Sequence, residues 1–201
     1  MGAPMVKNQI SILGINGSPR KSGGTVNMLK EVLGEAQKSG AHTKLINLAD
    51  YKMRPYHGDY DRKPDAETMK IFKEMSRFEG YVFATPVHWL ASSSLMKIFI
   101  DNLTYLESQN FKLEGKIFGV VAHCWEDGGF QAAAQVASIL DHMGLISPPY
   151  SIMLRNKNIK RSADTKWMWT DTKLLGKNVV LLCDIVRRNK PNWGYDYEKT
   201  D

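Results

Sequence analysis

The chain is poor in cysteine: among its 201 residues only Cys124 and Cys183 carry a thiol. Two thiols so far apart in the sequence exclude a disulfide framework and a four-thiolate metal site. Runs of about 18 apolar residues are also lacking, so the sequence predicts no membrane-spanning segment. Residues 1–9 hold no apolar stretch ahead of a cleavage site, which argues against a secretory signal. We therefore expect a cytoplasmic protein.

Acidic residues are fewer than basic ones, with 21 Asp and Glu against 27 Lys and Arg, which gives a formal net charge of +6. A basic surface attracts nucleic acids and anionic ligands. The sequence lacks zinc-finger spacing, an aromatic RNP pattern and a basic zipper, so we expect no nucleic-acid partner. Residues 187–190 form the longest basic cluster and close the last expected helix, where cations complement the carbonyl end of the helix dipole. The excess charge is therefore typical of a solvated surface.

Short apolar runs alternate with segments of helical periodicity. The runs at 10–15, 81–84 and 116–122 are nearly continuous, as is typical of strands covered on both faces. Residues 42–48 carry polar insertions that suit an edge strand, and a fifth strand falls within 145–154. The periodicity predicts helices at 25–39, 66–77, 95–106 and 130–143, and a last one that carries Leu175, Val179, Leu182 and Val186.

This alternation predicts a single α/β domain over residues 1–201, with a parallel sheet covered by helices on both faces. In such sheets the ligand binds beyond the carboxyl ends of the strands. The loops that follow the strands are therefore the segments to examine for function.

The loop after the first strand, residues 16–25, holds three glycines, three hydroxyl groups and two cations. Glycines let the backbone approach a ligand, and hydroxyls, amides and a helix N-terminus together bind phosphate. The spacing fits neither a Walker A loop nor the G-x-G-x-x-G pattern, because Arg20 replaces the glycine before Lys21 and no glycine follows Gly14 two positions on. With these two patterns excluded, the loop is interpreted as a binding site for a single phosphate group. The alternative is an ordinary loop with Thr25 as the helix N-cap.

The run Gly17-Ser18-Pro19-Arg20-Lys21, followed by two glycines and Thr25, resembles the phosphate loop of the flavodoxin-like NADPH-dependent FMN reductase family. Multimeric flavodoxins and iron–sulfur flavoproteins are its relatives. The resemblance implies a flavodoxin-like three-layer sandwich with a five-stranded parallel sheet of order 2-1-3-4-5. It also implies that the FMN phosphate is held by Ser18, Arg20, Lys21, Thr25 and the amide of Val26. Family members often carry Asn where this chain has Gly24.

Residues 85–101 resemble the second signature of the family, T-P-V-Y-W followed by S-x-x-L-K-x-F-I-D. The resemblance implies that Pro86, Val87, His88 and Trp89 line the isoalloxazine. His88 stands where Tyr is usual, so it either tunes the flavin or fills space, and Trp89 is alternatively a core aromatic. We expect Ser93 to cap the following helix and Lys97 to pair with Asp101 at its surface.

The resemblance places the loop after the fourth strand against the pyrimidine side of the flavin, with His123, Gly128 and Gly129 as candidates. Cys124 and His123 are adjacent on a strand end and therefore point to opposite sides, so we expect Cys124 to be buried rather than activated.

The iron–sulfur branch carries clustered cysteines in the segment that corresponds to residues 53–62, and here that segment has none. No cluster is expected, and His57, Asp59 and Asp61 suggest a solvated loop rather than a metal site. Tyr56 and Tyr60 are weaker candidates for the roof of the flavin pocket.

Residues 155–172 are expected to form an elaborated loop, with Lys157, Lys160 and Arg161 ahead of Trp167-Met168-Trp169. Exposed aromatics beside cations are frequent at interfaces. We expect a homodimer or homotetramer contact or a cover over a neighbour's flavin here, with a core-packing loop as the alternative.

The resemblance implies an FMN-containing oxidoreductase that takes electrons from NADPH or NADH and passes them through FMN to a small acceptor such as a quinone, a flavin or a nitro compound. No side chain is nominated as a catalytic acid or base, and no metal is expected. The alternative is a flavodoxin-like electron carrier without a substrate of its own, although such carriers are usually acidic. A third reading is an anion-binding or nucleic-acid-binding module without flavin.

Overall fold

A computed structural model describes residues 9–158 and 166–191. Along the chain its elements are β1 (Ser11–Asn16), α1 (Gly24–Lys38), β2 (His42–Asn47), η1 (Leu48–Asp50), α2 (Ala66–Met75), β3 (Gly80–His88), β4 (Ala91–Ser92), α3 (Ser94–Asn102), α4 (Thr104–Ser108), β5 (Ile117–Cys124), α5 (Gly129–His142), β6 (Ile152–Asn156) and α6 (Lys166–Arg188).

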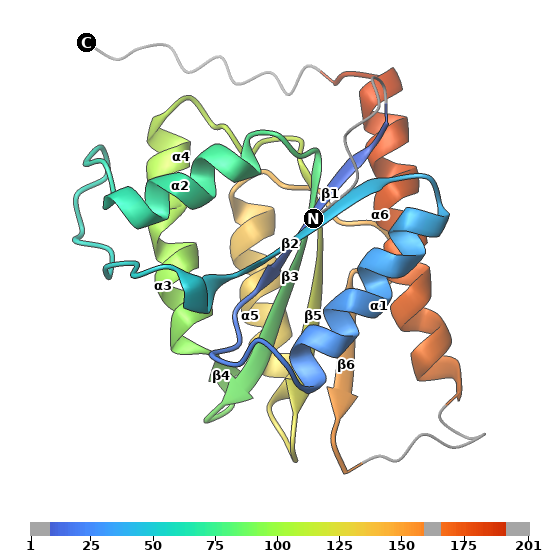
Figure 1. Ribbon diagram of the computed structural model, residues 1–201. Helices are drawn as coiled ribbons and strands as arrows, with labels where there is room; N and C mark the ends of the chain where they lie inside the picture. The colour runs from blue at the N-terminus through green and yellow to red at the C-terminus, as the bar shows by residue number, and fades with distance from the viewer. Residues whose placement is uncertain (1–8, 159–165, 192–201) are drawn as a thin grey trace.

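Five of the strands form a parallel sheet in the order β2-β1-β3-β5-β6, which is the predicted order 2-1-3-4-5 (Figure 1). The sixth strand, β4, has two residues and pairs antiparallel with the end of β3. β2 lies at the edge that its polar insertions predicted. All six residues of β1 are buried, as expected for a strand covered on both faces.

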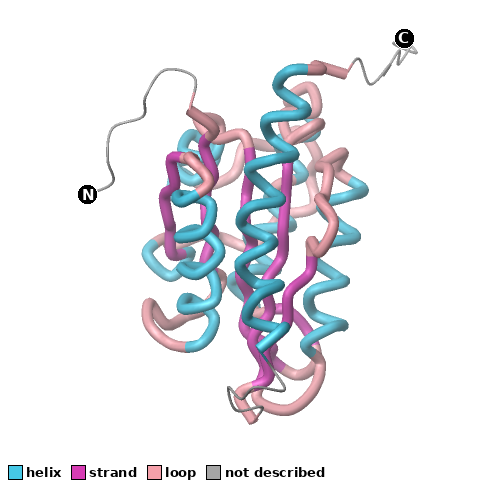
Figure 2. The backbone as a smooth tube through the Cα atoms, turned by 90° about the vertical axis from the view of Figure 1, so that its right-hand side faces the viewer, coloured by secondary structure: helices cyan, strands magenta, loops and turns pink. Residues whose placement is uncertain are grey.

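Side chains alternate between two apolar cores, one on each face of the sheet. Leu13 and Phe83 belong to the core covered by α2, α3 and α5. Ile12 and Val82, their neighbours in sequence, belong to the core covered by α1 and α6. Figure 1 shows the resulting three layers, with α1 and α6 on one side of the sheet and α2, α3 and α5 on the other, and Figure 2 looks onto the side covered by α1 and α6. No described helix combines the length and the apolar composition that crossing a membrane requires.

Three boundaries differ from the sequence-based expectation. β3 continues to His88 instead of ending at Ala84, because β5 pairs with it as far as Pro86 and β4 pairs with Val87 and His88. The expected helix at 95–106 breaks at the buried Leu103 into α3 and α4, where the amide of Leu103 bonds three residues back to Ile100.

The third difference concerns residues 155–172. Arg155 and Asn156 belong to β6, and the residues from Lys166 onward belong to α6. Trp167 and Trp169 are therefore helical. The expected basic residues Lys160 and Arg161 lie outside the described residues.

Helices α1 and α6 pack so closely that a methyl group at Gly176 would lie 2.2 Å from the carbonyl oxygen of Val32. Gly176→Ala should therefore lower the free energy of unfolding by about 1–3 kcal/mol. Gly34 of α1 is the matched control: a Cβ there meets nothing within 4 Å, so Gly34→Ala should raise stability by up to about 1 kcal/mol through helix propensity. Urea unfolding followed by circular dichroism measures both, and equal stability of the two variants would contradict the close packing.

Candidate functional site

A cleft with a volume of about 440 Å³ lies at the carboxyl edge of the sheet, among the loops that follow β1, β3, β5 and β6. This is where parallel sheets bind ligands, and the volume lies within the range of about 300–1,000 Å³ that is usual for small-molecule sites. The lining residues are Ser18, Pro19, Arg20, Ser22, Gly23, Gly24, Thr25, Pro86, Val87, His88, His123, Trp125 and Lys157.

The loop after β1 is held in shape by the fully buried side chain of Asn16. Its carbonyl oxygen accepts from the amide of Ser18 at 3.1 Å, and its amide nitrogen donates to the carbonyl of Arg20 at 3.2 Å and to the side chain of Asn47 at 3.0 Å. These bonds join the loop to β2, so the first four loop residues have a fixed conformation before any ligand arrives.

A second anchor joins the same loop to β3 and α3. The amide of Gly17 donates to the carbonyl of Ala84 at 2.7 Å, and the hydroxyl of Ser93 donates to the carbonyl of Gly17 at 2.6 Å. The Ser93 hydroxyl also accepts from the amide of Met96, which confirms its expected role as the N-cap of α3. The expected ion pair of Lys97 with Asp101 is present as well.

Helix α1 begins without a side-chain cap. Its N-cap is Gly23, with a φ of 119° that favours glycine, and Thr25 is the second helical residue, so the alternative in which Thr25 caps the helix is wrong. The first amide that bonds along the chain is that of Asn27, to the carbonyl of Gly23. The amides of the first turn therefore point toward the cleft as donors for an anion.

The two neighbouring cations of the loop point in different directions. Arg20 lines the cleft. Lys21 forms an ion pair with Asp50 at the end of η1, and its ammonium group holds the pKa of the Asp50 carboxyl below the usual value. The structure thus places Ser18, Arg20 and Thr25 in the cleft and Lys21 outside it. The side chain of Val26 is buried beneath α1, which leaves only its backbone amide for a ligand.

The segment expected to lie against the flavin ring is the end of β3 and its hairpin to β4. Pro86, Val87 and His88 line the cleft. Trp89 lies at the hairpin tip, is fully exposed and is not among the lining residues, so it is not a core aromatic. Trp89 and Leu90 have φ angles of 49° and 64°, the conformation of a type I′ turn that normally takes Asn and Gly.

Gly128 and Gly129 lie behind this hairpin rather than in the cleft. Gly128 has a φ of 81°, and a Cβ there would lie 2.6 Å from the Cα of Leu90. A Cβ on Gly129 would lie 3.1 Å from the Sγ of Cys124. Their small size therefore lets the start of α5 approach the hairpin and the end of β5.

Outside the loop after β1, two lining side chains, Trp125 and Lys157, were not predicted as site residues. The ammonium group of Lys157 lies 3.3 Å from the centroid of the Trp125 ring, a cation–π contact that joins the loop after β5 to the end of β6. The sequence offered one signal for Trp125, which is an aromatic residue directly after a buried strand. Nothing in the sequence indicated that Lys157 would meet it.

Cys124 is buried and turned away from His123, as expected. Its thiol lies 3.5 Å from the carbonyl oxygen of Arg155, and burial raises its pKa above the usual value. His123 instead lies with its ring against Gly24 of α1. The two residues do not form a nucleophile–base pair.

Residues 51–65 contribute no residue to the cleft lining. Tyr56 stacks on His57 at a centroid distance of 5.4 Å, so neither it nor Tyr60 roofs the cleft. The described residues contain no group of three or more His, Cys, Asp or Glu side chains placed to hold a metal ion.

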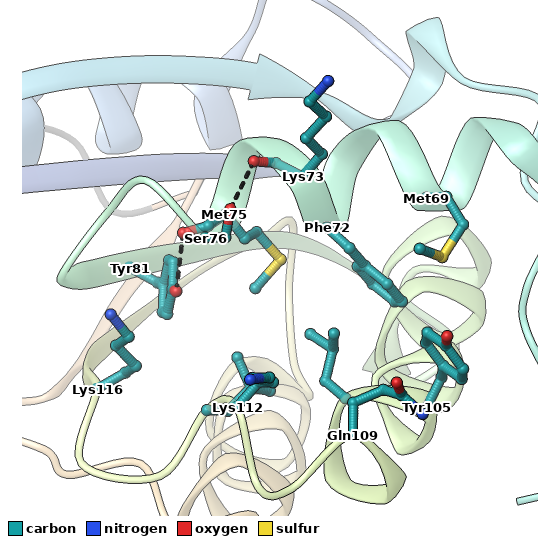
Figure 3. Close-up of a pocket in the computed structure, with 12 residues that line it drawn as sticks. Met69, Phe72, Lys73, Met75, Ser76, Tyr81, Tyr105, Gln109, Lys112 and Lys116 are labelled. Atoms are coloured by element: carbon teal, nitrogen blue, oxygen red, sulfur yellow. Dashed lines mark hydrogen bonds between the residues drawn. The ribbon is translucent and has the colours of Figure 1, made fainter. Parts of the chain in front are cut away.

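A second cavity of about 450 Å³ lies near the opposite end of the sheet, between α2, α4 and the start of β5 (Figure 3). Its walls are mostly apolar, with Met69, Phe72 and Tyr105 on one side and Lys112 and Lys116 at the rim. No glycine is among its lining residues, and it lies at the amino ends of the strands. The cleft at the carboxyl edge is therefore the better candidate for function.

Comparison with known proteins places the chain in a family. A model of the NADPH-dependent FMN reductase family matches residues 10–158. An iron–sulfur flavoprotein of Methanocaldococcus jannaschii is 29% identical over 119 residues, which cover 56% of this chain and 61% of that protein. An iron–sulfur flavoprotein of Archaeoglobus fulgidus is 28% identical over 152 residues, which cover 72% of this chain and 74% of that protein. The match to the first thus spans less than two thirds of its length.

Solved structures show the fold alone, because their sequence identities are low. RosB with bound 8-demethyl-8-formylriboflavin-5′-phosphate superimposes with a TM-score of 0.76 at 17% identity, covering 90% of this chain and 82% of that chain. An apo NADH:FMN oxidoreductase superimposes with a TM-score of 0.64 at 18% identity, covering 84% of this chain and 89% of that chain. An archaeal flavodoxin superimposes with a TM-score of 0.60 at 16% identity, covering 88% of this chain and 99% of that chain. The fold is therefore flavodoxin-like.

Both thiols should resist a chromogenic disulfide reagent in the native protein. Burial raises the pKa of Cys183 to about 12 and raises that of Cys124, and only the thiolate reacts. Labelling should therefore stay slow between pH 7 and pH 9, whereas unfolding in urea should release both thiols of the chain. The absorbance of the released reagent counts the thiols. Rapid labelling of either thiol in the native state would contradict the burial of these two residues.

Proposed function

The chain belongs to the NADPH-dependent FMN reductase family, and we propose that it binds FMN in the cleft and acts as an NAD(P)H-dependent oxidoreductase. In this proposal electrons pass from a nicotinamide donor through FMN to a small acceptor. The observation that carries it is the division of the cleft into a phosphate-binding end at α1 and an apolar wall at the end of β3.

The phosphate-binding end has the donors that a phosphate monoester needs. The uncapped first turn of α1 offers backbone amides, Ser18 and Thr25 offer hydroxyls, and Arg20 supplies a positive charge. Asn16 and Ser93 fix the loop that carries them. A phosphate bound here meets preformed donors and therefore costs little ordering of the chain.

The other end of the cleft fits a planar ring. Pro86 and Val87 form a wall at the end of β3, and Trp125 faces the cleft from the loop after β5. Lys157 holds the indole through its cation–π contact. A flat aromatic system of the size of isoalloxazine is what such a wall and indole accept.

When bound, FMN supplies the hydride and electron chemistry of the family. The chain's own residues bind the phosphate, orient the ring against β3 and leave the mouth of the cleft open to donor and acceptor. No described side chain has to move a proton in this scheme, so we nominate no catalytic acid or base.

The curated relatives are iron–sulfur flavoproteins, but this chain has only two cysteines. Cys124 ends β5, whereas the Sγ of Cys183 lies beside Gly80 at the start of β3, at the other end of the sheet. These two thiols cannot ligate one cluster. We therefore propose that electrons leave the flavin directly to a small acceptor.

The first test is the visible absorption spectrum of the purified protein with added FMN, followed by NADPH and then NADH under anaerobic conditions. We expect a bound-flavin spectrum that bleaches promptly with at least one of the two donors. Flavin that accepts electrons only from dithionite would favour a carrier instead. Failure to bind added FMN would overturn the proposed function and favour an anion-binding module.

The second test compares the two adjacent cations of the phosphate loop. Arg20→Ala should weaken FMN binding about tenfold or more, because it removes a charged donor from the cleft. Lys21→Ala should weaken it less than about threefold, since Lys21 pairs with the exposed Asp50 outside the cleft. Flavin fluorescence quenching measures both dissociation constants. A larger loss for Lys21→Ala would overturn the assignment of the phosphate site.

A further inference from the structure

His123 lies at the phosphate-binding end of the cleft rather than at a ring edge. Its backbone pairs with Pro86 on one side and Arg155 on the other, in the centre of the carboxyl edge. If Gly24 carried a Cβ, the Nε2 of His123 would lie 2.0 Å from it and the two flanking ring carbons at 2.3 and 2.4 Å. The imidazole therefore takes the volume that a side chain on the first residue of α1 would fill.

This position brings the imidazole edge to the donors already described. Gly24 is the first residue of the uncapped helix, so Nε2 lies beside the amides of its first turn. Arg20 and Thr25 line the same end of the cleft. An anion bound by the amides of this first turn would therefore contact the imidazole of His123.

The charges that surround the imidazole are mostly positive. Burial lowers the pKa of His123 first, and the charges of Arg155 and Lys157 lower it further. From the other elements, Arg20 and His88 line the cleft with it.

The carboxylates of this region do not raise the pKa of His123. Glu31 of α1 forms an ion pair with Arg155 at 2.7 Å, and Glu126 and Asp127 are exposed on the loop after β5. Without an anion in the cleft, the neutral imidazole is therefore the favoured form.

We propose that His123 is a phosphate-anchoring residue that is neutral in the free protein and takes up a proton from solvent when the FMN phosphate binds. This inference rests on the proposed function, because it needs the FMN phosphate in this end of the cleft. A phosphate dianion within hydrogen-bond reach reverses the local balance of charge and stabilises the imidazolium. No other bond is made or broken, and the proton ends on a ring nitrogen of His123.

The coupling has a defined sign. The pKa of His123 lies below its ordinary value of 6.5 in the free protein and rises in the complex. The affinity that His123 adds is therefore largest at low pH and is lost as the pH rises through the pKa of the complex. The second ionisation of the phosphate, at about pH 6, acts in the opposite direction but is common to every variant. The ratio of dissociation constants between a variant and the unmodified protein isolates the histidine.

The test measures the dissociation constants of FMN and riboflavin from pH 5 to pH 9 for the unmodified protein, His123→Gln and the control His142→Gln. His142 is exposed in the last turn of α5, far along the helix from the cleft. We expect His123→Gln to bind FMN about tenfold or more weakly at low pH and less than about threefold more weakly at pH 9. Riboflavin, which lacks the phosphate, should show no such dependence, and His142→Gln should follow the unmodified protein.

Calorimetry of FMN binding to the unmodified protein, in two buffers of different ionisation enthalpy, measures the proton uptake without any variant. Uptake beyond that of riboflavin, and beyond the same experiment on His123→Gln, supports the proposal. If the ratio of FMN dissociation constants between His123→Gln and the unmodified protein stays constant with pH, or if there is no excess proton uptake, the proposal is overturned and His123 is a neutral contact. Equal losses for FMN and riboflavin would show a packing role instead. If the unmodified protein binds neither flavin, the proposed function itself fails.

Discussion

The buried side chain of Asn16 holds together the loop on which the candidate site depends. It stands at the end of β1 with no exposed surface and bonds to Ser18, Arg20 and Asn47. A loop of three glycines would otherwise sample many conformations, and each would cost entropy to order around a ligand. With Ser93 bonded to Gly17 from α3, the loop is fixed by strands and helices on both sides.

The absence of a cap on α1 follows from the same arrangement. A Ser, Thr, Asp or Asn at position 23 would satisfy the first-turn amides and occupy the place of an anion. Gly23 adopts a φ of 119° and leaves these amides to the cleft. Two other helices have side-chain caps, Asp65 on α2 and Ser93 on α3, whereas α5, like α1, starts at a glycine, Gly128. Of these two glycine starts, only that of α1 is among the residues that line the cleft.

Gly24 and the ring of His123 pack against each other at one end of the cleft. The first turn of α1 requires glycine at position 24 because the ring of His123 fills the space that a side chain would take. These residues are 99 positions apart, and only the pairing of β5 with β3 and β6 brings His123 to the carboxyl edge beside the start of α1. The pairing with β5 extends β3 to Pro86, and the pairing of Val87 and His88 with β4 turns an expected loop into a hairpin.

The sequence by itself determined the α/β fold and the loops that form the candidate site, because hydrophobic periodicity and turn residues are local properties of the chain. The strand order was implied by the resemblance of two loops to a known family. It also predicted the cap at Ser93 and the burial of Cys124. Tertiary structure alone decided which of the candidate side chains share the cleft. Lys21 turns to Asp50, Trp89 projects from a hairpin tip, and Trp125 with Lys157 completes the wall. Those outcomes depend on strand register and on partners distant in the chain, which no local pattern records.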